Sequence, residues 1–264
     1  MKKDRKQPRF KKPSEFASEA EVTAETAKAL DWAASNYAHA MYWHKDFQKL
    51  ARLDSLEQTE QDRIFNELVV GCIALIMLSL DAPDVGARDE MKSHFRKIQD
   101  AVPDAHVCCL QELGVKSKHL KDWKKLIRMR FDEYARDRHG VRAAAMKLES
   151  QDKDLDLKGL SRIQAMVPLQ TVAIGTHTHI CRGETDGRDE LFKFILNKLG
   201  TFYVKFRVML EGRRITRLQR MRIAISRALR RIRRSTRKPP TSMFSVRCSM
   251  LDVQIFTSPS VCNR

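Results

Sequence analysis

The stretch LVVGCIALIMLSL, residues 68–80, is the most apolar run of the 264-residue chain and decides how the chain folds. It is thirteen residues long and includes Gly71 and Ser79. Because a membrane span needs about 20 apolar residues, this length favours the central helix of a protein core over a membrane helix. We therefore expect a protein that is not integral to a membrane and is built around this helix.

Amphipathic helical patterns lie on both sides of the apolar run. Ser18 and Glu21 form a capping-box pattern, and apolar residues then recur at gaps of three and four as far as Leu50. Ser117 begins another long helix, whose apolar stripe extends to Leu148. Long amphipathic helices joined by short connections pack best against one another. The pattern therefore predicts a mainly α protein containing an antiparallel helical bundle.

The distribution of charge predicts the domain organisation. Residues 1–13 carry seven basic residues and one acidic residue, whereas residues 14–150 carry twenty basic and twenty-three acidic residues. The remaining residues, 151–264, carry twenty-three basic and nine acidic residues, so the net charge of +17 is concentrated at the two ends. We expect a bundle that folds on its own between basic ends. The predicted segments are a basic flexible arm (1–13), a helical bundle domain (14–150), a linker (151–159), a basic C-terminal region (160–238) and a tail (239–264).

The smaller C-terminal region is predicted to be mostly helical, with an α+β arrangement as the alternative. Apolar residues from Leu191 to Met209 recur at helical spacing, which favours a helix. Apolar residues between 202 and 210 also alternate, as they do in a strand. In the α+β arrangement, residues 169–181 would form part of a small strand pair.

An arginine-rich helix is expected near the end of the chain. Residues 205–238 hold fourteen Lys or Arg residues and one acidic residue, Glu211. Apolar residues from Ile215 to Ile232 recur at heptad-compatible gaps, and Pro239 ends the pattern. Nine arginines lie off this apolar stripe and are the predicted phosphate contacts: Arg213, Arg214, Arg217, Arg220, Arg227, Arg230, Arg231, Arg233 and Arg234.

Such a helix has four possible surroundings: nucleic acid, an acidic protein, an anionic membrane surface, or solvent alone. Guanidinium groups pair with phosphate oxygens in a bidentate manner and displace condensed counterions. We therefore favour a non-enzymatic protein that associates with RNA or DNA through sequence-nonspecific phosphate contacts. A helical scaffold or assembly subunit that binds an acidic protein partner is the alternative.

One short segment has the chemistry of a metal site. In GTHTHIC, residues 175–181, the side chains of His177, His179 and Cys181 would project from one face if the segment were extended. Two imidazoles and a thiolate suit zinc, so a metal-dependent enzyme is the second alternative. The chain lacks a phosphate-binding loop, a dinucleotide-binding glycine motif and a nucleophile elbow. We therefore expect no catalytic residues and no cofactor.

Cysteine usage and the N-terminal sequence favour a cytoplasmic protein. The six cysteines are scattered and include no Cys-x-x-Cys spacing, which argues against a disulfide framework. No apolar stretch follows the basic N-terminal residues, which argues against a secretory signal.

Overall fold

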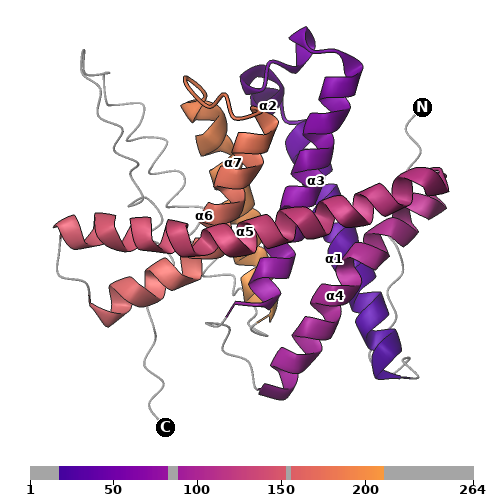
Figure 1. The fold of residues 1–264 in the computed structure, drawn as a ribbon, viewed down its shortest axis with the longest axis horizontal. Helices are drawn as coiled ribbons and strands as arrows, with labels where there is room; N and C mark the ends of the chain where they lie inside the picture. Colours follow the sequence, from indigo (N-terminus) through magenta and orange to yellow (C-terminus); the bar gives the residue numbers. More distant parts are fainter. Residues whose placement is uncertain (1–17, 83–88, 153–155, 211–264) are drawn as a thin grey trace, which may run out of the picture. The chain divides into compact units, whose positions relative to one another are not determined.

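The computed structural model describes residues 18–82, 89–152 and 156–210. Within these ranges the chain forms seven α-helices and one short 3-10 helix, and no strand (Figure 1). The prediction of a mainly α protein with a helical bundle is confirmed. The helices are α1 (Glu19–Tyr42), α2 (Lys45–Leu50), α3 (Gln58–Leu80), α4 (Asp89–Glu112), α5 (Ser117–Asp152), α6 (Leu157–Ile180) and α7 (Asp189–Leu210), and the 3-10 helix is η2 (Leu53–Ser55).

Helix α3 lies at the centre of this arrangement. Every residue from Glu67 to Leu80 is buried. A helix that is apolar on all sides must be covered all round, and α3 contacts α1, α4, α5, α6 and α7. By length and composition alone α3 is also long and apolar enough to cross a membrane, although 83% of its most apolar window is buried within the protein. The expectation that the chain is not a membrane protein stays a prediction.

The first predicted helix is interrupted before it reaches Leu50. Its beginning is as expected, because the Ser18 hydroxyl accepts a hydrogen bond from the Glu21 amide at 3.2 Å. Helix α1 then ends at Tyr42, and His44 has an extended backbone. The imidazole Nδ1 of His44 accepts a hydrogen bond from the amide of Asp46 at 3.2 Å and so caps α2. The single long helix expected here is therefore two helices with a capped junction.

The segments whose secondary structure was ambiguous in the sequence are helical where the structure describes them. Residues 169–180 belong to α6 and residues 202–210 belong to α7, so the strand pair is not formed there. Val172 of α6 and Ile195 of α7 lie in the same buried cluster as Ile73 of α3. Helices α6 and α7 thus complete the core around α3. The boundary predicted at 151–159 stays a prediction.

Two glycines allow α6 to approach its neighbours closely. A Cβ atom at Gly71 of α3 would lie 2.4 Å from Oγ1 of Thr176 on α6. A Cβ atom at Gly175 of α6 would lie 2.1 Å from Cε1 of Tyr134 on α5. Side-chain carbons do not approach other atoms this closely, so the packing of α6 requires glycine at both positions.

The substitution Gly175→Ala tests this packing. The added methyl group overlaps the fully buried ring of Tyr134, so we expect the free energy of unfolding to fall by roughly 1–3 kcal/mol. Gly140→Ala on α5 is the matched control, because its added Cβ would meet no atom within 4 Å apart from its chain neighbours and the local helix backbone. That change should raise the stability by up to about 1 kcal/mol through helix propensity. Urea denaturation measures both variants, and equal effects would contradict the close contact.

Candidate functional site

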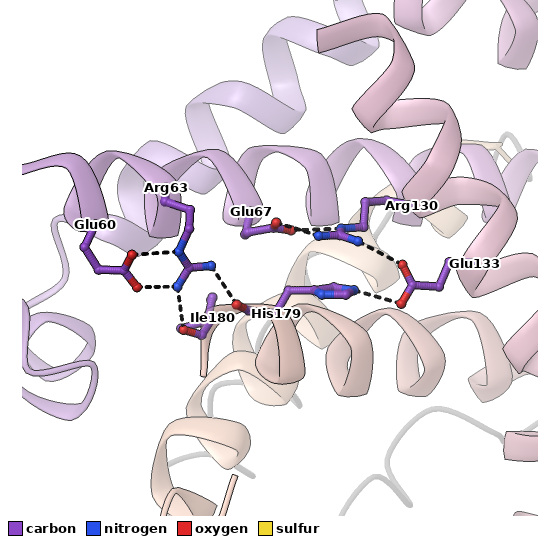
Figure 2. Close-up of polar contacts among 7 residues, drawn as sticks. All are labelled: Glu60, Arg63, Glu67, Arg130, Glu133, His179 and Ile180. Carbon is purple, nitrogen blue, oxygen red and sulfur yellow. Dashed lines mark hydrogen bonds and ion pairs between the residues drawn. The ribbon is translucent and has the colours of Figure 1, made fainter. Parts of the chain in front are cut away.

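The most extensive polar arrangement among the described helices is a charged layer between α3, α5 and α6 (Figure 2). Its members come from one face of α3, from adjacent turns of α5 and from the last residues of α6. On α3 and α5 these residues are three or four apart in sequence and so lie side by side on one face, whereas His179 and Ile180 are consecutive residues at the end of α6. The charged layer consists of Glu60, Arg63 and Glu67 of α3, Arg130 and Glu133 of α5, and His179 of α6, and it includes the backbone carbonyl oxygen of Ile180.

Arg130 joins α5 to α3. Its Nε donates to Oε2 of Glu67 at 3.2 Å and one terminal nitrogen donates to Oε1 at 2.8 Å, which makes the pair bidentate. The other terminal nitrogen donates to Glu133 at 3.0 Å. The side chains of Arg130 and Glu67 are only 15% and 8% exposed. Burying either charge alone would cost several kcal/mol, so each residue requires the other in this position.

Glu133 extends the layer from α5 to α6. Its Oε1 lies 2.9 Å from Nε2 of His179. The next residue, Tyr134, is fully buried, and its ring centre lies 6.2 Å from that of His179. Burial raises the pKa of Tyr134 far above its ordinary value, more than the neighbouring Thr176 hydroxyl lowers it. Neither of these two hydroxyls makes a hydrogen bond of ordinary geometry.

Arg63 caps the C-terminal end of α6. It donates to the carbonyl oxygens of His179 at 2.7 Å and Ile180 at 2.9 Å. These carbonyls are at the negative end of the helix dipole, where the helix itself supplies no amide donor, and that of His179 also accepts from the Arg182 amide at 3.3 Å. Arg63 is held in turn by Glu60, at 2.9 and 2.6 Å, and Arg182 also contacts Glu60. The hydrogen bond from Arg63 is the main reason that the pKa of Glu60 is lowered to about 2.

The structure does not bring the predicted metal ligands together. The segment 175–180 is the end of α6, so the extended backbone that the metal hypothesis requires is not present. His177 Nε2 lies 3.2 Å from the carbonyl oxygen of Arg188, whereas His179 faces Glu133. Burial also raises the pKa of Cys181, which disfavours the thiolate. In the described ranges no group of three or more His, Cys, Asp or Glu residues is arranged to hold a metal ion.

The nine arginines from Arg213 to Arg234, which the sequence predicts as phosphate contacts, lie outside the described residues. The structure therefore gives no geometry for them.

A buried polar contact between Asp31 and His106 joins α1 to α4. His106 Nδ1 lies 2.7 Å from Oδ1 of Asp31, with side-chain exposures of 4% and 2%. The ring of Trp123 on α5 meets the His106 ring edge-on, with centroids 5.1 Å apart. Neither this pair nor the charged layer was predicted from the sequence. The sequence did contain one signal for buried polar contacts, because Asp31 and Glu67 are single acidic residues next to apolar positions of the expected helices.

The charged layer is suited to fixing helices rather than to binding a substrate. Its carboxylates and guanidinium groups are engaged with one another on α3 and α5 and with the His179 ring and backbone carbonyl oxygens at the end of α6. The hollow that the described residues form at α2 is lined by Lys45, Lys49 and Arg52 among others and includes no member of the layer. Comparison with protein families, curated proteins and solved structures found no match to this chain.

The pH dependence of the stability lost in Glu60→Gln tests whether Glu60 holds Arg63 in place to cap α6. Because the folded pKa of Glu60 is lowered to about 2 from 4.5, its contribution to stability is complete above pH 4.5 and is lost as the pH falls towards 2. Glu60→Gln should therefore destabilise the protein at pH 7, by on the order of 2 kcal/mol, and by progressively less in acid. Denaturation curves from pH 7 to pH 2.5 measure this difference.

Glu190→Gln is the matched control, because that carboxylate is 72% exposed and forms a surface ion pair with Lys193 on the same helix, α7. It is expected to change the stability little, as is usual for surface ion pairs. A Glu60→Gln penalty that stayed constant down to pH 2.5 would contradict the assigned role.

Proposed function

We propose that this protein is non-enzymatic and associates with RNA or DNA through sequence-nonspecific phosphate contacts. The observation that carries the proposal is the segregation of charge along the chain. Residues 14–210 hold 29 basic and 30 acidic residues, and so are nearly neutral. Residues 1–13 have a net charge of +6, and residues 211–264 have 14 basic against 2 acidic residues. A nearly neutral helical unit between strongly basic ends is typical of proteins that contact a polyanion.

The choice of basic residue supports nucleic acid over an acidic protein. Of the 14 basic residues in 211–264, 13 are arginines. The planar guanidinium group pairs with two phosphate oxygens at once and stays charged at every physiological pH. Lysine would give the same net charge without this geometry. An arginine excess of this size therefore favours phosphate as the ligand.

In this proposal the helical bundle includes α6 and α7, and the part of the basic C-terminal region (160–238) that follows α7 forms an arginine-rich amphipathic helix. The apolar stripe of that helix docks on protein, while the nine arginines face the phosphates. The arm at 1–13 adds contacts from the other end of the chain. We place the protein in the cytoplasm, without a metal or cofactor.

Neutralising four arginines tests the proposal. The variant carries Arg230→Gln, Arg231→Gln, Arg233→Gln and Arg234→Gln, and its affinity for short RNA and DNA is measured by fluorescence anisotropy between 50 and 200 mM salt. We expect weaker binding to every sequence. The slope of log affinity against log salt should flatten by about 0.9 for each phosphate that the variant no longer neutralises. Glutamine is a good helix former, so the substitution does not itself disfavour a helix.

The control for net charge carries Lys28→Gln, Lys92→Gln, Arg96→Gln and Lys193→Gln, four exposed positions on α1, α4 and α7. It removes the same charge and should keep most of the affinity. Equal binding by the parent and the arginine variant would rule out these arginines as the contact surface. Tighter binding to polyglutamate than to nucleic acid would favour the scaffold alternative.

A further inference from the structure

The outward face of α5 presents a row of basic side chains to solvent. Lys118, Lys121, Lys125 and Arg128 follow one another at gaps of three and four residues, and all four are exposed. Arg136, also exposed, lies on the same face two turns further on. We refer to these five residues as the α5 basic row. Two exposed acidic residues lie beside the row: Asp132, between Arg128 and Arg136, and Asp122, four residues after Lys118.

The opposite face of the same turns is fixed in the core. Leu120, Ile127 and Tyr134 are buried, and Arg130 is held by Glu67 and Glu133 in the charged layer. In Figure 1, α5 runs across α3, on which it packs. Any rotation of α5 would break the bidentate pair between Arg130 and Glu67. The α5 basic row is therefore held in one orientation with its charges pointing away from the core.

The lysines of the row are not held in ion pairs by the acids that the structure describes. Lys118, Lys121 and Lys125 make no ion pair with any residue that the structure describes. Lys124, one position to the side, does pair, with Asp104 of α4 at 2.5 Å. A guanidinium N–H of Arg128 reaches only a backbone oxygen, that of Asp100, at 3.5 Å.

These lysines also lie at the wrong end of the helix for stability. The first turns of α5 are at the positive end of the helix dipole, where acidic residues are stabilising and basic residues are not. The first turn contains no acidic residue, and Lys118 and Lys121 are found there and just beyond it. Basic residues that oppose the helix dipole and make no compensating ion pair are expected at positions where function requires their charge.

The dimensions and composition of the row indicate its ligand. From Lys118 to Arg136 a helix rises about 27 Å, close to the axial length of eight base pairs of duplex. A row of cations at helical spacing on a helix of fixed orientation suits the regularly spaced phosphates of a duplex. Binding of single strands usually depends on exposed aromatic rings that stack on bases. The Trp, Phe and Tyr side chains between Lys118 and Arg136, which are Trp123, Phe131 and Tyr134, instead pack in or against the core.

We propose that the α5 basic row is a second phosphate-contacting surface, on which the backbone of a nucleic acid duplex lies along α5. This inference rests on the proposed function and assigns it a ligand class and a surface on the folded helices. The charged layer on the inner side of α5 is what holds the surface rigid. Contacts are made to phosphates alone, so binding is independent of base sequence.

The test is made in the full-length chain with Lys118→Gln, Lys121→Gln and Lys125→Gln combined. Affinities are measured for a 20-base-pair DNA duplex, an RNA duplex of equal length and the matching single strands. We expect roughly tenfold weaker duplex binding, with a salt slope reduced by about 2–3. Binding to single strands should change much less. Thermal unfolding should show no loss of stability, because the removed charges opposed the helix dipole.

Lys92→Gln, Arg96→Gln and Lys193→Gln provide the control, with the same reduction of charge at exposed positions on α4 and α7. If the parent binds duplex and the α5 variant behaves like this control, the row is not a contact surface and the proposed function stands. Equal weakening for duplexes and single strands overturns the assignment to duplex. If the parent binds no nucleic acid at any salt concentration, both the proposed function and this inference are wrong.

Discussion

The burial of α3 on every side is the constraint on which the rest of the structure depends. Fourteen consecutive residues, Glu67–Leu80, are withdrawn from solvent, and no single neighbouring helix can cover such a surface. Five helices contact it, including α6 and α7, which follow the linker predicted at 151–159. The small residue Gly71 gives α6 room to reach α3, and the Ser79 hydroxyl donates to the carbonyl oxygen of Leu75 at 2.5 Å. The core therefore extends through α7.

The charged layer begins where the apolar surface of α3 ends. Glu67 is the first residue of the buried stretch, and Arg63 and Glu60 precede it on the same face. At this end, α3 contacts α5 and α6 through ions and helix carbonyls instead of apolar side chains. Because the ions have directional geometry, they fix the rotation of α5 about its axis more narrowly than apolar packing does. The outward direction of the α5 basic row is a consequence of that fixed rotation.

Features that depend on local periodicity could be predicted from the sequence. The core helix at 68–80, the Ser18 cap and the helix that begins at Ser117 all follow from spacing or capping preferences. The break at His44 could not, because an imidazole replaces the usual capping side chains. The charged layer could not either, since Glu67 and Arg130 are 63 residues apart and periodicity carries no information on distant partners. The metal hypothesis depended on an extended segment that the core requires to be helical.

Native-state hydrogen exchange of the full-length protein tests most directly whether α3 and its five neighbours form one cooperative core. Amides in the middle of α3, around Ile73, should exchange only by global unfolding. Amides around Val172 of α6 and Ile195 of α7, which share the buried cluster, should show the same free energy of opening and the same dependence on denaturant. Opening of α6 and α7 at a clearly lower free energy, with α3 still protected, would show that these two helices are not part of that core.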